Sequence, residues 1–164
     1  PWRPSHEPPS GDYPLIFTTG RTVYQFHTRT KTGRVPELDA AAPEAWLEIC
    51  SLDAEPLGIS EGDLVRVESR RGELQLRARV SGVRQGVVFA PFHYGYWDAR
   101  CDGGAADPPM RAANELTMTD WDPVSKQPVL KVAAVRVSRI ESKERFSTAP
   151  SETASRPVEG VIGP

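Results

Sequence analysis

An alternation of apolar and polar side chains over residues 64–80 constrains the fold of this chain more than any other feature. In the second half of the segment the apolar positions are Leu74, Leu76, Ala78 and Val80, with polar side chains between them. Successive side chains of a strand point to opposite faces, so the pattern predicts an antiparallel hairpin that turns at residues 70–72. We expect Gly72 to supply the positive φ angle that tight hairpin loops need.

Short apolar segments elsewhere predict further strands. These are residues 15–17, residues 86–90, and residues 131–137 with an end near Ile140. The third contains Lys131 and Arg136 among apolar residues, and the first runs into a Thr-Gly-Arg sequence that is typical of a strand end. We expect Leu76, Val87 and Phe89 to lie in the core.

Helical signals are weak. Residues 51–55 predict a helix capped by Ser51 and ending near Gly58, and Pro56 would limit it to about one turn. Residues 43–49 fit either a helix or a strand. The chain is rich in turn formers, with 16 prolines and 13 glycines. Together these features predict a mainly β fold: a small closed or nearly closed β structure with one or two short helices.

Composition divides the chain into three parts. Four prolines in residues 1–12 predict an extended linker. Residues 13–140 contain the predicted strands and form the folded domain. Residues 141–164 are rich in Ser, Thr, Glu and Pro and are expected to be disordered, because they hold too little apolar surface to offset the entropy of ordering. The chain begins at Pro1 without an initiator Met, so we expect it to be a piece of a larger protein.

Charge and composition argue against several classes of function. The formal net charge of −2 gives no support for a nucleic-acid binder. No apolar run is long enough to span a bilayer and no signal peptide is visible, so we expect no membrane partner. Cys50 and Cys101 have no second Cys or His at ligand spacing, which argues against a zinc or iron–sulfur site in this chain. Two free thiols are the simplest interpretation, and a disulfide is the alternative.

Residues 13–36 are basic in an otherwise slightly acidic chain. They contain four Lys and Arg residues and no acidic residue. Gly20 allows close approach of a ligand to the backbone, and Arg21 can bind a phosphate through two parallel hydrogen bonds. The segment therefore predicts either a pyrophosphate-binding turn or a basic surface loop, and this segment alone does not decide between them.

Four separated sequence blocks resemble one family. The first joins Thr19-Gly20-Arg21 to His27-Thr28 and Gly33; the second runs from Glu48 to Asp53 and on to Gly72; the third is Pro91-Phe92-His93; the fourth runs from Asn114 through Asp122-Pro123 to Lys131 and Val137. In order and spacing they resemble the C-terminal domain of the molybdopterin oxidoreductases that carry two pterin-guanine dinucleotides, such as formate dehydrogenases and nitrate reductases. The resemblance extends from about Pro14 to Ile140.

The resemblance implies a double-psi β-barrel that packs onto a larger catalytic body. It also implies that the barrel helps to hold bis-molybdopterin guanine dinucleotide around molybdenum. The implied cofactor-binding residues are Thr19, Gly20, Arg21, His27, Thr28, Phe92, Asn114 and Lys131. The metal ligand and any iron–sulfur cluster would belong to an N-terminal part that this chain lacks, so we expect the chain to be inactive on its own.

Four of these residues also have a structural alternative. The alternatives are a surface cation for Arg21, a tie between two loops for His27, an N-cap for Asn114 and a solvated strand residue for Lys131. The other cations of the basic segment, namely Arg29, Lys31 and Arg34, are expected to face solvent, and the alternative is that they add to the positive field that receives the phosphates. Residues 93–113 form a longer loop than is usual for the family, and this departure from the family pattern directly follows Phe92.

Two functions from different classes therefore compete. The first is the cofactor-binding domain of a molybdenum oxidoreductase acting on a small inorganic or one-carbon substrate, with the rest of the catalytic subunit as its partner. Nitrate or formate would be the substrate, and a nitrate reductase of assimilatory type is slightly favoured on general likeness. The same likeness implies a cytoplasmic location. The second is a stand-alone β-barrel module that binds nucleotides or proteins without redox chemistry. Recurrence of Asn114 and Lys131 at family spacing after the Thr-Gly-Arg block favours the first.

Overall fold

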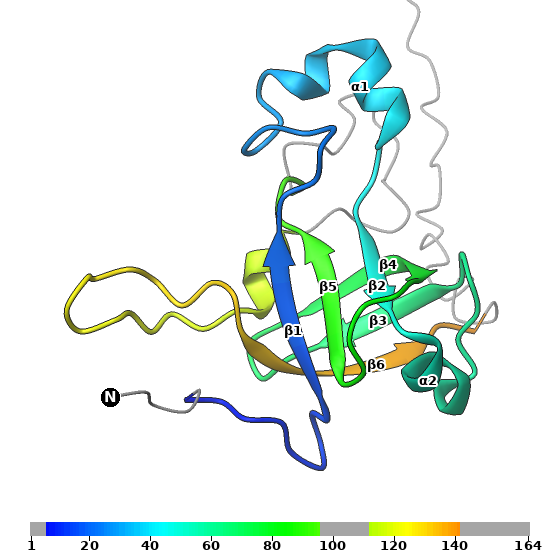
Figure 1. Ribbon diagram of the computed structural model, residues 1–164, viewed down its shortest axis with the longest axis vertical. Helices are drawn as coiled ribbons and strands as arrows, with labels where there is room; N and C mark the ends of the chain where they lie inside the picture. The colour runs from blue at the N-terminus through cyan, green and yellow to red at the C-terminus, as the bar shows by residue number, and fades with distance from the viewer. Residues whose placement is uncertain (1–5, 96–111, 142–164) are drawn as a thin grey trace, which may run out of the picture.

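The computed structural model describes residues 6–95 and 112–141, which form a closed barrel of six strands in the order β1-β5-β2-β4-β3-β6. The strands are β1 (Leu15–Gly20), β2 (Trp46–Ile49), β3 (Leu64–Glu68), β4 (Glu73–Val80), β5 (Val87–Pro91) and β6 (Ala133–Arg139). β1 pairs with β5, and β2 with β4, in parallel, and the other neighbours are antiparallel (Figure 1). The mainly β, closed-barrel fold expected from the sequence is confirmed.

The barrel encloses one apolar core. Phe17, Leu47, Ile49, Val65 and Val88 are completely buried in it. Burying one such side chain contributes roughly 1.5–3 kcal/mol relative to leaving it in water, so the strand interiors supply most of the driving force for closing the barrel.

The face of β5 that enters the core differs from our expectation. Val88 and Ala90 are buried, whereas Val87 and Phe89 are only partly buried on the outside. A shift of one residue exchanges the two faces of a strand, and all four side chains are apolar, so the sequence offers no alternation that would fix the choice. Leu76 is buried, as expected.

The hairpin over residues 64–80 is confirmed, but its turn is different from the predicted one. β3 and β4 pair as far as Glu68 and Glu73, which leaves a loop of residues 69–72. Ser69 N donates to Gly72 O at 2.9 Å, and Gly72 is not among the glycines with positive φ. A loop of this length is commonly built around a type I turn, which needs no left-handed residue.

The helices are short. α1 (Pro36–Ala41) begins with a proline at its first position, and the sequence did not reveal it. Residues 43–49, which fitted either element, contain strand β2. α2 (Ser51–Ala54) continues into the 3-10 helix η2 (Glu55–Leu57) and ends, as predicted, at Gly58 with a φ of 63°.

Two predicted boundaries are wrong by a residue or two. The cap of α2 is Cys50, and Ser51 is the first helical residue; no side-chain hydrogen bond caps the helix. β6 begins at Ala133 and not at residue 131, so Lys131 precedes the strand.

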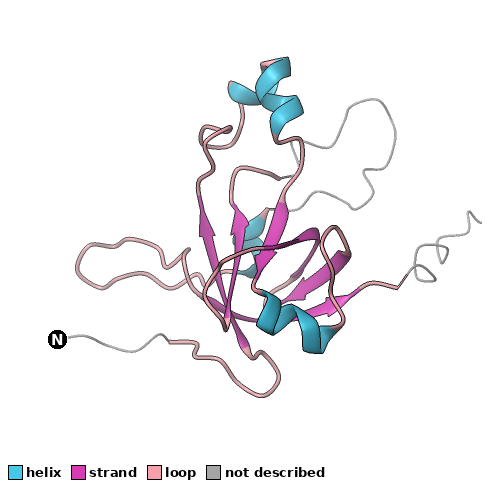
Figure 2. Cartoon of the chain, turned by 45° about the vertical axis from the view of Figure 1, so that its right-hand side comes forward, coloured by secondary structure: helices cyan, strands magenta, loops and turns pink. Residues whose placement is uncertain are grey.

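The connections give the domain its outline. Residues 21–45, here called the excursion, rise from the end of β1 and carry 3-10 helix η1 (Thr32–Arg34) and α1 before the chain returns as β2 (Figures 1 and 2). Residues 117–132 extend to one side as a long loop before β6. The described part of the chain holds no helix long and apolar enough to cross a membrane. Of the predicted disordered tail only Glu141 is described, and most of the 93–113 loop also lies outside the described residues.

Candidate functional site

The barrel topology brings three connections together at one end. β1 and β5 are parallel and their last pair is Gly20 with Pro91, so the segments that follow them leave from the same edge. β6 is antiparallel to β1, with Ala133 opposite Phe17, so the residues just before β6 lie beside the end of β1. Predicted site residues that are far apart in sequence therefore meet.

A cavity of about 560 Å³ opens where these segments meet. It is lined by Thr19, Arg21, Phe92, Asn114, Leu130 and Lys131. Five of the eight residues implied by the family resemblance are in this set. The volume lies within the usual range for a small-molecule site.

Lys131 lies over the end of β1. Its Nζ donates to Thr19 O at 3.0 Å and lies 4.7 Å from the centre of the Phe92 ring. Burial lowers the pKa of Lys131, and the positive charge of Arg21 lowers it further. Both effects disfavour the charged amine, and an anion placed between the two cations would oppose them.

No acidic residue is among the described residues that line the cavity. The described part of the chain also contains no ion pair of Arg21, and Arg21 is exposed. The cavity therefore presents two cations whose charge no lining carboxylate balances, an arrangement suited to a phosphate or pyrophosphate group.

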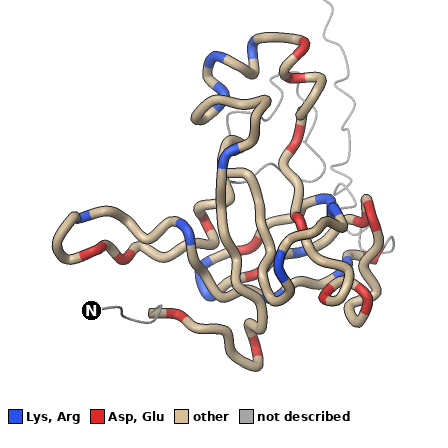
Figure 3. The backbone as a smooth tube through the Cα atoms, viewed as in Figure 1, with Lys and Arg blue, Asp and Glu red and all other residues tan. Residues whose placement is uncertain are grey.

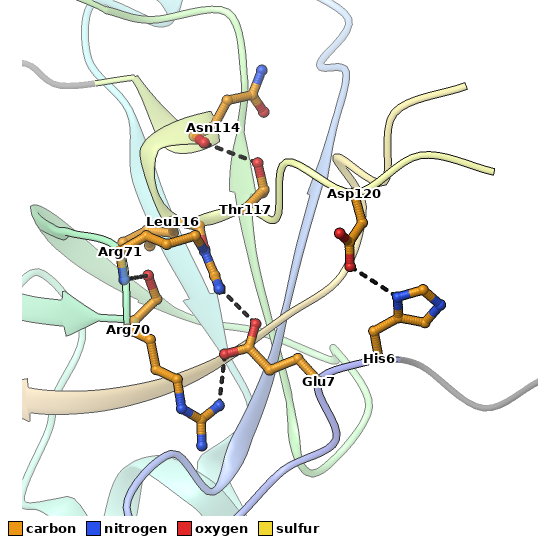
Figure 4. Close-up of polar contacts among 9 residues, drawn as sticks. His6, Glu7, Arg70, Arg71, Asn114, Leu116, Thr117 and Asp120 are labelled. Atoms are coloured by element: carbon orange, nitrogen blue, oxygen red, sulfur yellow. Dashed lines mark hydrogen bonds and ion pairs between the residues drawn. The ribbon is translucent and has the colours of Figure 1, made fainter. Parts of the chain in front are cut away.

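Asn114 lies within the 3-10 helix η4 (Ala113–Leu116) and not at its N-cap, which is Ala112. Its backbone oxygen accepts a hydrogen bond of 2.9 Å from Thr117 Oγ1. The side chain of Glu115 accepts from Ala112 N at 3.1 Å and holds the start of the helix. Figure 4 shows the Asn114 side-chain amide pointing away from the hydrogen bond to Thr117, and Asn114 lines the cavity.

Gly20 is explained by packing. A Cβ atom at this position would lie 2.6 Å from Cε2 of Phe89, which is too close for an ordinary contact. Gly20 is not among the described residues that line the cavity. Its direct contact with a ligand stays a prediction, while the need for glycine follows from the Phe89 ring.

His27 and Thr28 lie on the excursion and are exposed. The His27 ring packs edge-on against Phe26 at 4.3 Å between ring centroids, and neither His27 nor Thr28 is among the described cavity-lining residues. Their cofactor contacts stay predictions.

Acidic residues of the same domain partly neutralise the positive charge of the excursion. Arg29, which we expected to face solvent, is only 6% exposed, pairs with Asp39 of α1 and lies over the Tyr94 ring. Lys31 and Arg34 are exposed, as expected. Figure 3 shows Lys and Arg on the excursion and acidic residues on the adjoining α1. The local positive charge is therefore smaller than residues 13–36 alone suggest.

His93 is a buried residue of this region to which sequence reasoning assigned no role. It is 2% exposed, and its two ring nitrogens bond to backbone atoms of Thr22 and His27. The sequence feature that could have indicated a role for His93 is its position directly after Phe92 in the third sequence block.

A second polar network binds the last residue of η4, Leu116. The Glu7 carboxylate accepts hydrogen bonds from Arg70 at 2.8 Å and from Arg71 at 2.6 Å. Arg71 also donates from Nη2 to Leu116 O at 2.9 Å (Figure 4). Burial raises the pKa of Glu7, but the hydrogen bonds and charges of Arg71 and Arg70 outweigh it, and the pKa is lowered. Nothing in the sequence pattern indicated this role for a residue of the predicted linker.

Comparison with known proteins supplies an independent line of evidence. Residues 15–134 match the family model described as "Molydopterin dinucleotide binding domain". The chain is 42% identical over 140 residues to the F420-dependent formate dehydrogenase subunit alpha of Methanocaldococcus jannaschii, an alignment that covers 85% of this chain and 19% of that protein. It is 39% identical over 140 residues to the periplasmic nitrate reductase of Desulfovibrio desulfuricans, covering 85% of this chain and 17% of that protein.

Among solved structures, the acetylene hydratase from Pelobacter acetylenicus matches with a TM-score of 0.65 and 21% identity, over 83% of this chain and 21% of that one. This likeness supports the fold alone. The chain spans less than a fifth of the length of the two curated relatives.

Proposed function

Because the chain belongs to the molybdopterin dinucleotide binding domain family, we propose that it holds the pterin-guanine dinucleotide of a molybdenum oxidoreductase in the cavity described above. The single observation that carries this assignment to particular residues is the meeting of Arg21 and Lys131 in a cavity whose described lining contains no carboxylate. A dinucleotide carries a pyrophosphate, which is the kind of anion that such a pair of cations binds.

The remaining lining residues fit the rest of the ligand. Pterin and guanine rings present both hydrogen-bond donors and acceptors, which the Asn114 amide and the Thr19 hydroxyl can pair with. Phe92 offers a ring face for packing against a planar group. The molybdenum supplies the redox chemistry when the cofactor is bound, and the residues of this chain bind and orient the cofactor.

We propose further that the chain is one domain of a larger catalytic subunit with two such dinucleotides. Its match to less than a fifth of each of the two relatives supports this arrangement. The rest of the subunit would supply the metal ligand and any iron–sulfur cluster. The parent activity that we favour is nitrate reduction or formate oxidation, since the relatives are named for these substrates.

The family match favours this function over a stand-alone nucleotide- or protein-binding module. The test is to purify the complete polypeptide that carries this chain from a host that makes the cofactor. Bound metal and the guanine nucleotide released by acid hydrolysis are then measured. We expect two guanine nucleotides per molybdenum; a well-folded protein with neither metal nor nucleotide would exclude the proposed function.

A further inference from the structure

His93 joins the segment that follows β5 to two points on the excursion. Its Nε2 lies 2.8 Å from Thr22 N, and its Nδ1 lies 2.6 Å from His27 O. The backbone N–H can only donate and the carbonyl oxygen can only accept, so these partners fix the ring as the neutral tautomer with its proton on Nδ1.

The two bonded positions lie next to residues with predicted cofactor contacts. Thr22 follows Arg21, which lines the cavity, and His27 precedes Thr28. His27 has a φ of 47°, a left-handed conformation that is uncommon for residues other than glycine. The bond from His93 to His27 O is one contact that holds it.

The neighbouring residue anchors the excursion at its other end. Tyr94 is 2% exposed and donates its hydroxyl hydrogen to Ala42 O at 2.8 Å, and Arg29 lies over its ring. Phe92, which comes directly before His93, lines the cavity. Phe92 thus lines the cavity, His93 binds the start of the excursion, and Tyr94 binds its end. The segment after β5 therefore sets the position of the excursion relative to the cavity.

We propose that His93 is a positioning residue for the dinucleotide site. By binding Thr22 N and His27 O with one rigid ring, it fixes the path of the backbone that leaves Arg21, and so holds the guanidinium at the cavity. The cofactor part of this inference rests on the proposed function, whereas the ordering of residues 22–27 does not.

Substitutions at position 93 can separate the contributions of the two ring nitrogens. In His93→Gln the side-chain oxygen takes the place of Nε2 and keeps an acceptor for Thr22 N, while the donor to His27 O is lost. In His93→Asn the amide nitrogen takes the place of Nδ1, which keeps that donor and loses the acceptor. His93→Ala removes both groups. Tyr94→Phe is the matched control, because it removes the bond to Ala42 O and leaves the His93 contacts intact.

The experiment is hydrogen–deuterium exchange resolved to single residues, on the complete protein in its cofactor-free form. We expect the Thr22 amide to exchange about fivefold to tenfold faster in His93→Asn and His93→Ala, as for the loss of one hydrogen bond, and at nearly the wild-type rate in His93→Gln and Tyr94→Phe. A general loss of packing would not distinguish Gln from Asn. The melting temperature of each variant identifies any that fails to fold. If His93→Ala does not fold, the comparison of His93→Gln with His93→Asn still tests the proposal.

The second readout is the guanine nucleotide retained by each variant after purification from a cofactor-producing host. We expect less nucleotide in His93→Asn and His93→Ala than in His93→Gln. Unchanged Thr22 exchange in all variants overturns the role of His93, as does faster exchange with full nucleotide retention. A different result would overturn the proposed function instead. In that case Thr22 exchange changes as expected, but the wild-type protein carries no guanine nucleotide. The failure of the His93 role and the failure of the proposed function can therefore be told apart.

Discussion

Glu7 and Arg71 form an ion pair with 2.6 Å between Oε2 and Nη2, although 64 residues separate them in the sequence. Because Arg71 also binds Leu116 O at the end of η4, the pair connects the segment that precedes the barrel to the helix that carries Asn114. These contacts therefore tie the incoming chain to the helix that forms one wall of the cavity.

Neutralising this carboxylate should destabilise the domain in a pH-dependent way. The pKa of Glu7 in the folded state is lowered from its ordinary value of 4.5. Its stabilisation is therefore fully present above about pH 4.5 and is lost as the pH falls through the lower, folded pKa. We expect Glu7→Gln to lose about 1–3 kcal/mol of unfolding free energy at pH 7 and much less in acid, measured by denaturation at each pH.

The matched control for that comparison is Glu141→Gln, which changes an exposed carboxylate. It should leave the unfolding free energy within about 0.5 kcal/mol of wild type at every pH. If Glu7→Gln shows a deficit of the same size at pH 3 and pH 7, the loss does not come from the charged pair.

Arg21→Ala should weaken cofactor retention without destabilising the fold. A hydrogen bond to a charged group contributes about 1.5–3 kcal/mol, so we expect affinity for the guanine dinucleotide to fall roughly 10-fold to 150-fold. The melting temperature should be nearly unchanged, because Arg21 is exposed. Arg34→Ala, another exposed arginine outside the described cavity lining, should retain the nucleotide. A large loss of stability with unchanged nucleotide content would contradict the assignment.

Gly20→Ala tests the packing explanation for this glycine. The added methyl group would meet the Phe89 ring, and overpacking of this kind costs about 1–3 kcal/mol. Replacing Phe89 with leucine in the same chain should recover part of that loss, and a double-mutant cycle of unfolding free energies measures the recovery. Equal losses with and without the Phe89 ring would mean that the ring is not the cause.

Arg29→Ala should destabilise the excursion, because it removes a buried guanidinium from Asp39 and from the Tyr94 ring. We expect a loss of about 1–3 kcal/mol in chemical denaturation. Lys31→Ala, two residues away and exposed, should cost little. Comparable losses in the two variants would show that the internal pairing with Asp39 contributes nothing specific.

The sequence predicted well where a regular pattern coincided with one buried face. The alternation in residues 64–80 identified β3 and β4, because their inner face packs in the core and their outer face meets water. The barrel end with Arg21, Phe92 and Lys131 followed from the family spacing, which the parallel pairing of β1 and β5 explains. The roles of these residues toward the cofactor remain predictions.

The sequence predicted poorly where the deciding partner is distant or is a backbone atom. Residues 46–49 form a strand because β2 pairs with β4 in parallel, a contact that local propensity does not contain. Arg29 is buried because α1 places Asp39 beside it. His93 binds two backbone atoms 71 and 66 residues away, and no side-chain pattern records such partners.

The pairing of β1 with β6 closes the barrel between the first and last of its strands, with Leu15 opposite Val135. On the ribosome, β1 has no partner on that side until β6 has left the exit tunnel. This edge of the first strand therefore stays unpaired while more than a hundred residues are synthesised, and its other edge stays unpaired until β5 has been made. The wall of the cavity in which Lys131 binds Thr19 can therefore form only after residue 131 has left the exit tunnel.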